Sequence, residues 1–417
     1  MRSAIVALLS LLVLAGCAGP LTRPETGVVG CAPFLVAPSG YALPAQPRAR
    51  GEAATDIHVL VLSGGGKYGA YGAGFLKGWL EAESSGRLGA DNPPLSAFTV
   101  VTGISTGAML QTFATMGTLG GAEGAAAIED AYAIYTTVSD ADLVRTRGLV
   151  ASLRSNGLVD PAGGLEALLA DRMARYWPRL QAMGPEHASL TGVVNLDNGA
   201  FYAADLLAIA RANQPHGPTC ARELVLASSA VPVGFPPRFI DGSPYVDGGV
   251  RFGAFMAGPL LDNLAASGPV RVHLRVIING NLSPNDPQDD AARALACDES
   301  TALTAAGACK PMKNELLPIA FRAASDILVA QVYRDSVYRL QRELEARGML
   351  ESSGFAFVPN RRIADAGCKR ATKDNFDNAY MRCLARIGHE DGLAQAWRSF
   401  SETPSEIAPG ETAPSGR

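Results

Sequence analysis

Two largely apolar segments, each followed closely by glycine, restrict the possible folds of this chain more than any other feature. Ile57–Leu62 and Phe98–Thr102 have the composition of strands that are buried on both faces of a sheet. Helical patterns follow them, around Phe75–Ala82 and Ala108–Thr115. Strands that alternate with helices predict a largely parallel sheet with helices on both faces. The sequence therefore predicts a fold of the α/β class.

The second half of the chain extends this pattern. Val270–Ile278 is a third apolar strand, and residues 319–347 have the periodicity of a long amphipathic helix. Residues 281–315, which contain prolines, aspartates and two cysteines, are expected to form a surface insertion. The apolar face of the long helix is predicted to consist of Val329, Tyr333, Val337, Leu340 and Leu344.

The first residues have the features of an export signal. Arg2 precedes a mostly apolar run, Ala4–Leu14, which is too short to span a membrane and leads through two small residues to Cys17. This ending resembles a bacterial lipobox, in which the peptide is cut before a cysteine that carries lipid. We therefore expect residues 1–16 to be a signal peptide, with an ordinary signal and an incidental cysteine as the alternative. Ala18 replaces the Asp that favours inner-membrane retention, so the expected location is the outer membrane, facing the periplasm.

Composition divides the rest of the chain. Residues 17–54 are rich in Pro, Ala and Gly and are expected to tether the lipid anchor to one large domain, residues 55–400. Residues 401–417 have no apolar pattern and are expected to be disordered. Of the 417 residues, 47% are apolar, which is ample for a large core. The net charge of −4, without a strongly basic segment, argues against a nucleic-acid partner.

The cysteines agree with an exported protein. The chain has seven, and six remain when Cys17 is set aside, an even number that an oxidising compartment would pair. Free buried thiols are the alternative. The chain has no CxxC motif or Cys/His cluster, so no zinc or other metal site is expected. Local spacing suggests the pairs Cys297–Cys309 and Cys368–Cys383, which leaves Cys31–Cys220.

Gly103–Gly107 reads G-I-S-T-G and lies between a predicted strand and a predicted helix. A serine in such a sharp turn projects its hydroxyl from the edge of the sheet, where it can act as a nucleophile. Gly103 and Gly107 would relieve crowding in the turn. The sequence therefore makes Ser105 the candidate nucleophile of this elbow.

A second glycine-rich turn follows the first predicted strand and consists of Gly64, Gly65, Gly66 and Lys67. Successive glycines allow backbone N–H groups to converge on an anion, here the oxyanion of acyl transfer. The same segment also reads G-x-G-x-x-G, as in dinucleotide-binding proteins. That alternative needs an acidic residue about 20 positions on, at the end of a strand. Glu81 and Glu83 lie on the predicted helix instead, so no cofactor is expected.

Asp247, Gly248 and Gly249 form a third motif, D-G-G, after a short apolar stretch. An acidic residue at a strand end, followed by two glycines, can enter a tight loop close to another main chain. The motif alone is also a common turn. Asp247 is therefore a further candidate site residue.

Together the motifs resemble the patatin-like phospholipase family, whose members carry a Gly-rich oxyanion loop, a G-x-S-x-G elbow and a D-G-[GA] motif in this order. A fourth block, residues 227–237, reads A-S-S-A-V-P-V-G-F-P-P and is similar to the family's A-S-x-A-x-P-x-x-F-P-P segment. The resemblance covers about residues 57–280. It implies a three-layer α/β/α fold with a mostly parallel central sheet.

The resemblance also implies a chemistry. Ser105 would be the nucleophile and Asp247 the base of a dyad, with Gly64–Lys67 as the oxyanion loop. The implied substrate is a phospholipid or another lipid ester, cleaved through an acyl-serine as by a phospholipase A, a lysophospholipase or an esterase. Ser63 stands where many members have Asp, and Lys67 stands where many have Arg. A lysine ammonium cannot make the planar bidentate contact that an arginine guanidinium makes.

Two alternatives remain open. An α/β-hydrolase-type triad needs a histidine after the acid, and only His273 and His389 follow Asp247. His273 lies within a predicted strand and is expected to be a satisfied core or sheet-face residue, while His389 is expected to be solvated. The second alternative is an envelope lipoprotein that keeps the fold without catalysis.

Overall fold

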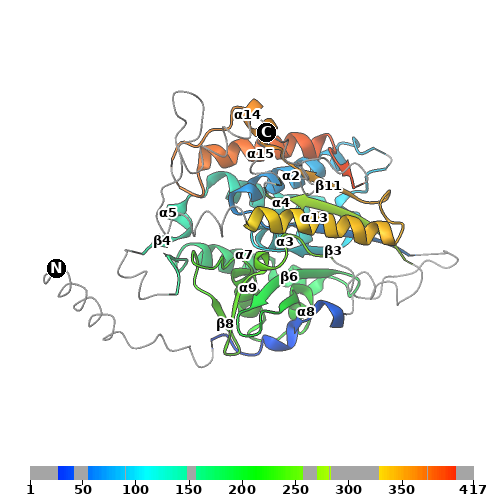
Figure 1. Cartoon of the computed structure of the whole chain (residues 1–417). Helices are drawn as coiled ribbons and strands as arrows, with labels where there is room; N and C mark the ends of the chain where they lie inside the picture. The colour runs from blue at the N-terminus through cyan, green and yellow to red at the C-terminus, as the bar shows by residue number, and fades with distance from the viewer. Residues whose placement is uncertain are drawn as a thin grey trace, which may run out of the picture.

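The computed structural model describes residues 27–41, 55–89, 91–147, 156–256, 270–280, 282, 328–372 and 374–400. These residues form an α/β fold around a large central sheet (Figure 1), whose middle five strands are parallel in the order β6, β3, β2, β10, β11. The predicted class and the mostly parallel sheet are therefore confirmed. The five strands are β2 (Thr55–Leu62), β3 (Phe98–Gly103), β6 (Ala188–Asn195), β10 (Val270–Ile278) and β11 (Gly354–Phe357).

Antiparallel strands complete the sheet. Beyond β6 lie β7 and β1, beyond β11 lies β12, and β9 pairs with both β6 and β8. β7 runs antiparallel to β6 because the turn between them is too short for a parallel crossover. These strands are β1 (Leu35–Val36), β7 (Phe201–Asp205), β8 (Arg238–Ile240), β9 (Ser243–Asp247) and β12 (Arg398–Ser399), and a separate two-stranded sheet joins β4 (Arg145–Thr146) to β5 (Val159–Asp160).

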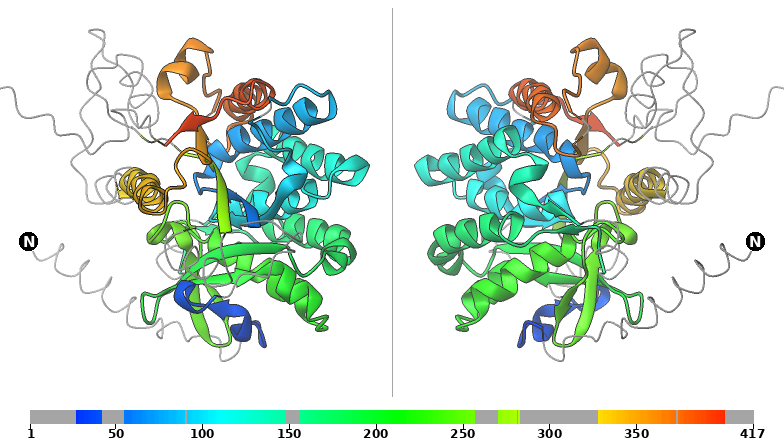
Figure 2. Two further views of the ribbon diagram at one scale, coloured as in Figure 1. Left: turned by 90° about the vertical axis from the view of Figure 1, so that its right-hand side faces the viewer. Right: turned by 90° about the vertical axis from the view of Figure 1, so that its left-hand side faces the viewer.

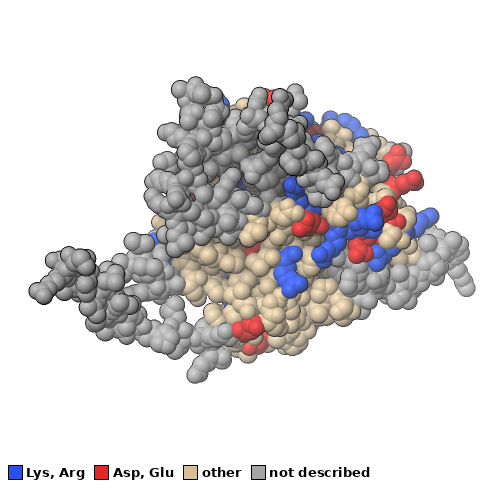
Figure 3. All heavy atoms as spheres, in the orientation of Figure 1, with Lys and Arg blue, Asp and Glu red and all other residues tan. Residues whose placement is uncertain are grey.

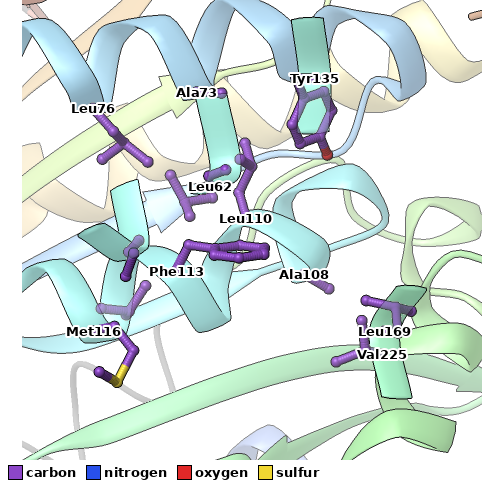
Figure 4. Close-up of a cluster of buried hydrophobic side chains, with 14 of the residues drawn as sticks. Leu62, Ala73, Leu76, Ala108, Leu110, Phe113, Met116, Tyr135, Leu169 and Val225 are labelled. Atoms are coloured by element: carbon purple, nitrogen blue, oxygen red, sulfur yellow. The ribbon is translucent and has the colours of Figure 1, made fainter. Parts of the chain in front are cut away.

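Helices cover both faces of the sheet, so the fold has three layers (Figure 2). One core contains side chains of α2, α3, α4, α7, α9 and α15 together with Leu60 and Leu62 of β2 (Figure 4). On the opposite face Val337 and Leu340 of α13 pack with Val59. The helices are α2 (Gly69–Ser84), α3 (Thr106–Gly117), α4 (Gly121–Thr137), α5 (Asp140–Leu143), α7 (Leu165–Ala182), α8 (Leu206–Arg211), α9 (Gly217–Ser228), α13 (Leu328–Ala346), α14 (Asn360–Asp365) and α15 (Asn378–Leu393).

The predicted amphipathic helix is confirmed over its described part, α13. Tyr333, Val337, Leu340 and Leu344 are buried, and Val329 is half-buried. The outward side carries charged residues of both signs, which gather over α13 in the space-filling view (Figure 3). Helix α13 therefore closes one face of the sheet with a single apolar stripe, as the spacing predicts.

Helices α2 and α15 touch backbone to backbone. A Cβ added to Gly74, Gly78, Gly388 or Gly392 would lie 2.0–2.2 Å from a carbonyl oxygen of the facing helix. Such distances do not occur between real atoms, so these four positions require glycine. We call them the glycine seam. It brings the C-terminal helix against the helix that follows the first glycine-rich loop.

Residues 27–41 fall inside the range expected to be a tether, yet they pack on the domain. β1 extends the sheet, and Cys31 forms a disulfide with Cys220 of α9. The Asp241 carboxylate accepts hydrogen bonds from the N–H groups of Gly30, Cys31 and Ala32 at 2.6–2.9 Å. These contacts attach the N-terminal segment to α9 and to the turn between β8 and β9.

Two predicted disulfides, Cys31–Cys220 and Cys368–Cys383, are confirmed. The expected signal peptide, Cys17, the tail and the pair Cys297–Cys309 lie outside the described residues, as does the expected insertion except for residue 282. Over the part of the chain that is described, no helix is both long and apolar enough to cross a membrane.

Candidate active site

Ser105 occupies the sharp turn between β3 and α3. Its φ is 54°, in the left-handed region that residues other than glycine rarely adopt, and the residue is 8% exposed. A Cβ on Gly103 would lie 2.5 Å from the Gly107 carbonyl oxygen, and one on Gly107 would lie 2.2 Å from that of Leu62. Any side chain at either flanking position would collide with the main chain, which confirms the predicted reason for the two glycines.

The A-S-S-A block holds both candidate catalytic residues. The Ser105 N–H donates to Ser228 Oγ at 3.0 Å, and Ser229 Oγ donates to the Ser105 carbonyl oxygen at 3.2 Å. The Asp247 N–H donates to the Ala230 carbonyl oxygen at 3.0 Å. Three consecutive residues therefore fix the main chain of the elbow relative to Asp247. The sequence reveals this block only as a family resemblance, and the structure shows its physical role.

Asp247 ends β9 and lies opposite Val193 of β6 in the sheet register. It is 3% exposed, and its carboxylate accepts a hydrogen bond from the Gly249 N–H at 2.7 Å. Burial raises the pKa of Asp247 to about 7, while the nearby Ser105 side chain and the Gly249 N–H oppose the rise. A carboxylate with this pKa can take and return a proton near neutral pH.

The first glycine-rich loop lies against the nucleophile. A Cβ on Gly64 would lie 3.0 Å from the Ser105 Cβ. Gly65 has a φ of 141°, and a Cβ there would fall 1.0 Å from the Asn279 carbonyl oxygen. The Asn279 N–H donates to Ser63 Oγ at 2.7 Å, and the Ser63 hydroxyl donates to the Gly64 carbonyl oxygen at 2.8 Å. Ser63, which departs from the family pattern, thus helps to fix the loop.

Two N–H groups of this loop are available to a ligand. The Gly64 N–H donates to the Gly253 carbonyl oxygen at 3.0 Å and is therefore occupied. Among the described residues, the N–H groups of Gly65 and Gly66 make no hydrogen bond. Gly66 also lines the same pocket as Ser105. The oxyanion donors suggested by the geometry are therefore Gly65 and Gly66.

A partly open pocket has Ser105 in its wall, with about 790 Å³ of empty space that includes open solvent. It lies among α3, α4 and α7, and apolar side chains such as Phe113, Leu165 and Leu169 dominate its lining. Arg172 is the charged residue in the lining, and its guanidinium lies 3.3 Å from the Asp130 carboxylate. A pocket with this apolar lining suits a hydrocarbon chain.

Residues 60–257 match the model of patatin-like phospholipases, a range that contains both Ser105 and Asp247. These residues belong to the patatin-like phospholipase family. Among curated proteins, no match was found. One solved structure that aligns is VipD from Legionella pneumophila, at 12% identity and a TM-score of 0.33, over 95% of this chain and 96% of that chain. The alignment is too loose to carry any conclusion.

Tyr333 lies outside the matched range but borders the patatin-like site, a position that the sequence did not indicate. Its hydroxyl is 2.5 Å from the point where a Cβ on Gly64 would sit, and its ring packs against Gly253. Burial and the negative charge of Asp247 raise the pKa of Tyr333, so the phenol stays neutral. One turn later, Ser336 Oγ accepts a hydrogen bond from the Gly253 N–H at 2.9 Å. Helix α13 thus forms a wall behind the dyad.

Lys67 turns toward aromatic rings. Its ammonium lies 5.7 Å from the ring centroids of Tyr68 and of Tyr380 on α15. Cation–π attraction holds the charge in this direction. The side chain thus ties the end of the glycine-rich loop to α15, and the loop's free donors are main-chain groups.

No histidine in the chain hydrogen-bonds to Ser105 or Asp247, and all five lie within described residues. His273 stacks on His58 and contacts Asp56 at 2.9 Å, near the start of β10. His389 was expected to be solvated, which is wrong. It is half-buried on α15 and contacts Glu81 at 2.8 Å. In the described part of the patatin-like domain and its surroundings, no group of three metal-binding side chains converges.

Proposed function

We propose that this chain hydrolyses acyl esters of lipids through a Ser105–Asp247 dyad and an acyl-serine intermediate. The observation that carries the proposal is the position of Ser105, in a strained elbow beside an apolar pocket, near enough to the buried carboxylate of Asp247 to lower its pKa. Strain at a residue other than glycine persists where the surroundings enforce it, often at functional sites.

In the first half of the reaction, Asp247 accepts the Ser105 proton while the serine oxygen attacks the ester carbonyl. A carboxylate with its ordinary pKa would be a weak base for a hydroxyl, and burial removes part of this mismatch. The N–H groups of Gly65 and Gly66 would stabilise the tetrahedral oxyanion. Each well-placed donor is worth about 2.7–4 kcal/mol in the transition state.

In the second half, protonated Asp247 gives its proton to the leaving alcohol, and the acyl group remains on Ser105. Asp247 then removes a proton from a water molecule that attacks the acyl-serine, and it returns this proton to the Ser105 oxygen as the acyl–serine bond breaks and the fatty acid leaves. The pocket holds the acyl chain in both steps, since its apolar lining matches a hydrocarbon chain. Phospholipase A, lysophospholipase and simple esterase activities are all compatible with this scheme.

A test combines a fluorophosphonate probe with hydrolysis assays on a panel of phospholipids, lysophospholipids and short-chain esters. Ser105→Ala should lose labelling and hydrolysis, and Asp247→Asn should lose hydrolysis. Ser85→Ala and Asp197→Asn are matched controls at exposed positions and should keep both. His273→Gln and His389→Gln should also remain active. A folded wild-type protein without labelling or hydrolysis would favour the non-catalytic lipoprotein.

We further propose that Cys17 carries the lipid anchor and that the domain faces the periplasm from the outer membrane. The support is the N-terminal sequence together with two disulfides in the folded domain, which suit an oxidising compartment. Labelling of cells with radioactive palmitate should mark the wild-type protein and not Cys17→Ser. Fractionation of the envelope would then locate the labelled protein.

A further inference from the structure

The segment that connects α9 to β8 (Figure 1) carries exposed apolar residues, and one of them lines the acyl pocket. Val231 lines the pocket and is nevertheless 39% exposed, Pro232 is exposed, and Val233 is 64% exposed. Leu158 is 43% exposed, and its N–H donates to the Val233 carbonyl oxygen at 3.0 Å. We call these four residues the apolar rim.

The main chain at Val233 is strained in a way that keeps this side chain exposed. Its φ is 71°, and among the described non-glycine residues with positive φ it is the β-branched one. Such a residue is a clear outlier, since its branched Cβ crowds the main chain. Hydrogen bonds from Leu158 to Val233 and from Val159 to Gly234, both 3.0 Å, hold the conformation. Glycine or asparagine would make the same turn with less strain.

The rim is continuous with the pocket. Val231 and Phe235 belong to the lining, so the exposed apolar surface leads without interruption to the cavity beside Ser105. Isolated exposed apolar residues are ordinary, but Val231-Pro232-Val233 are three in succession, a pattern that marks an interaction site. None of the four rim residues is charged. These properties suit the boundary between head groups and acyl chains of a zwitterionic bilayer.

We propose that the apolar rim docks on the surface of a lipid bilayer and lets an acyl chain pass from the bilayer into the pocket. The proposal rests on the lipid hydrolase function proposed above and names the physical state of its substrate, a lipid within a membrane. A chain that moves along Val231 and Phe235 stays on apolar surface, so its exposure to water is small.

The first test uses Val233→Asn in the full chain. Val233 does not line the pocket, and asparagine tolerates positive φ, so the folded structure should be retained. Hydrolysis of phosphatidylcholine in vesicles should fall about fivefold, because one apolar side chain no longer enters the bilayer. Hydrolysis of a water-soluble nitrophenyl butyrate should be unchanged. Val29→Asn is the matched control, at a 58% exposed valine outside the pocket lining, and should change neither rate.

Two results would overturn the proposal. One is an unchanged vesicle rate in Val233→Asn, and the other is an equal loss on both substrates, which would place Val233 in the chemistry instead of in docking. A melting temperature at or above that of the wild type would exclude misfolding as the cause of any loss, since the substitution relieves strain.

A second measurement does not depend on catalysis. In a Ser105→Ala background, a polarity-sensitive fluorophore attached to Val233→Cys should shift to shorter wavelength when phosphatidylcholine vesicles are added. The same fluorophore on Val29→Cys should not shift. If the wild type hydrolyses no ester but the shift occurs, the proposed function fails while docking stands. If hydrolysis occurs and the label at position 233 does not shift, docking on a bilayer is wrong.

Discussion

As the proposed base, Asp247 should set the pH range in which this site can work. A base must be ionised to accept the Ser105 proton, and burial raises the pKa of Asp247 to about 7. We therefore expect kcat/KM for a neutral short-chain ester to fall about tenfold per pH unit below this value and to level off above it. The measurement is a rate profile between pH 5 and pH 9. A profile whose midpoint lies near pH 4 would show a solvated carboxylate or a different base.

The same burial means that ionised Asp247 lowers the free energy of unfolding at high pH. Its folded-state pKa is raised from 3.8 to about 7, so its contribution to stability is fully present below about pH 4 and is lost as the pH rises through 7. Asp247→Asn removes the charge and should raise the free energy of unfolding at pH 8 by up to about 4 kcal/mol. Urea unfolding at pH 8 and pH 5 should show a smaller gain at the lower pH. Asp197→Asn, at an exposed turn, should show no such trend.

At the scale of elements, the glycine seam determines how closely α15 approaches α2. A Cβ on Gly388 would lie 2.0 Å from the Tyr71 carbonyl oxygen, so Gly388→Ala must separate the helices. We expect a loss of about 1–3 kcal/mol in the free energy of unfolding, despite the higher helix propensity of alanine. Gly40→Ala is the control, because its nearest contact would be an ordinary 3.5 Å. Equal stability of the two variants in urea would show that α15 can shift without cost.

The sequence predicts those elements whose pattern is local. β2, β3 and β10 are apolar runs, so these strands could be found without a structure. The elbow could also be found, because Gly103 and Gly107 flank Ser105 directly after β3. β1, β8 and β12 have two or three residues each, which is too short for any periodicity. Tyr333 was recognised as one of the buried residues of α13, but its place beside Asp247 depends on how α13 crosses the sheet. That crossing is a tertiary property and leaves no local pattern.

Over the whole molecule, segments distant in sequence meet at the candidate site. The first glycine-rich loop follows β2, Ser105 follows β3, Asp247 ends β9, and α13 closes the wall behind them. Parallel strands place their carboxyl ends at one edge of the sheet, which brings the first two together. β9 reaches the same place because it pairs antiparallel with the end of β6. The site therefore depends on the sheet as a unit, so the global stability of the domain affects activity directly.

The disulfide Cys31–Cys220 should be a major part of that stability. It joins residues 189 positions apart, and a cross-link that closes so long a loop restricts the unfolded chain strongly. We expect Cys31→Ser/Cys220→Ser to lower the free energy of unfolding by roughly 2–5 kcal/mol, while ester hydrolysis at low temperature remains, since neither cysteine lines the pocket. Thermal unfolding of both double variants measures the effect. Cys368→Ser/Cys383→Ser is the comparison, with a separation of only 15, and should lose less stability. A larger loss for the short loop would show that strain or packing, and not the restriction of the unfolded chain, dominates the effect.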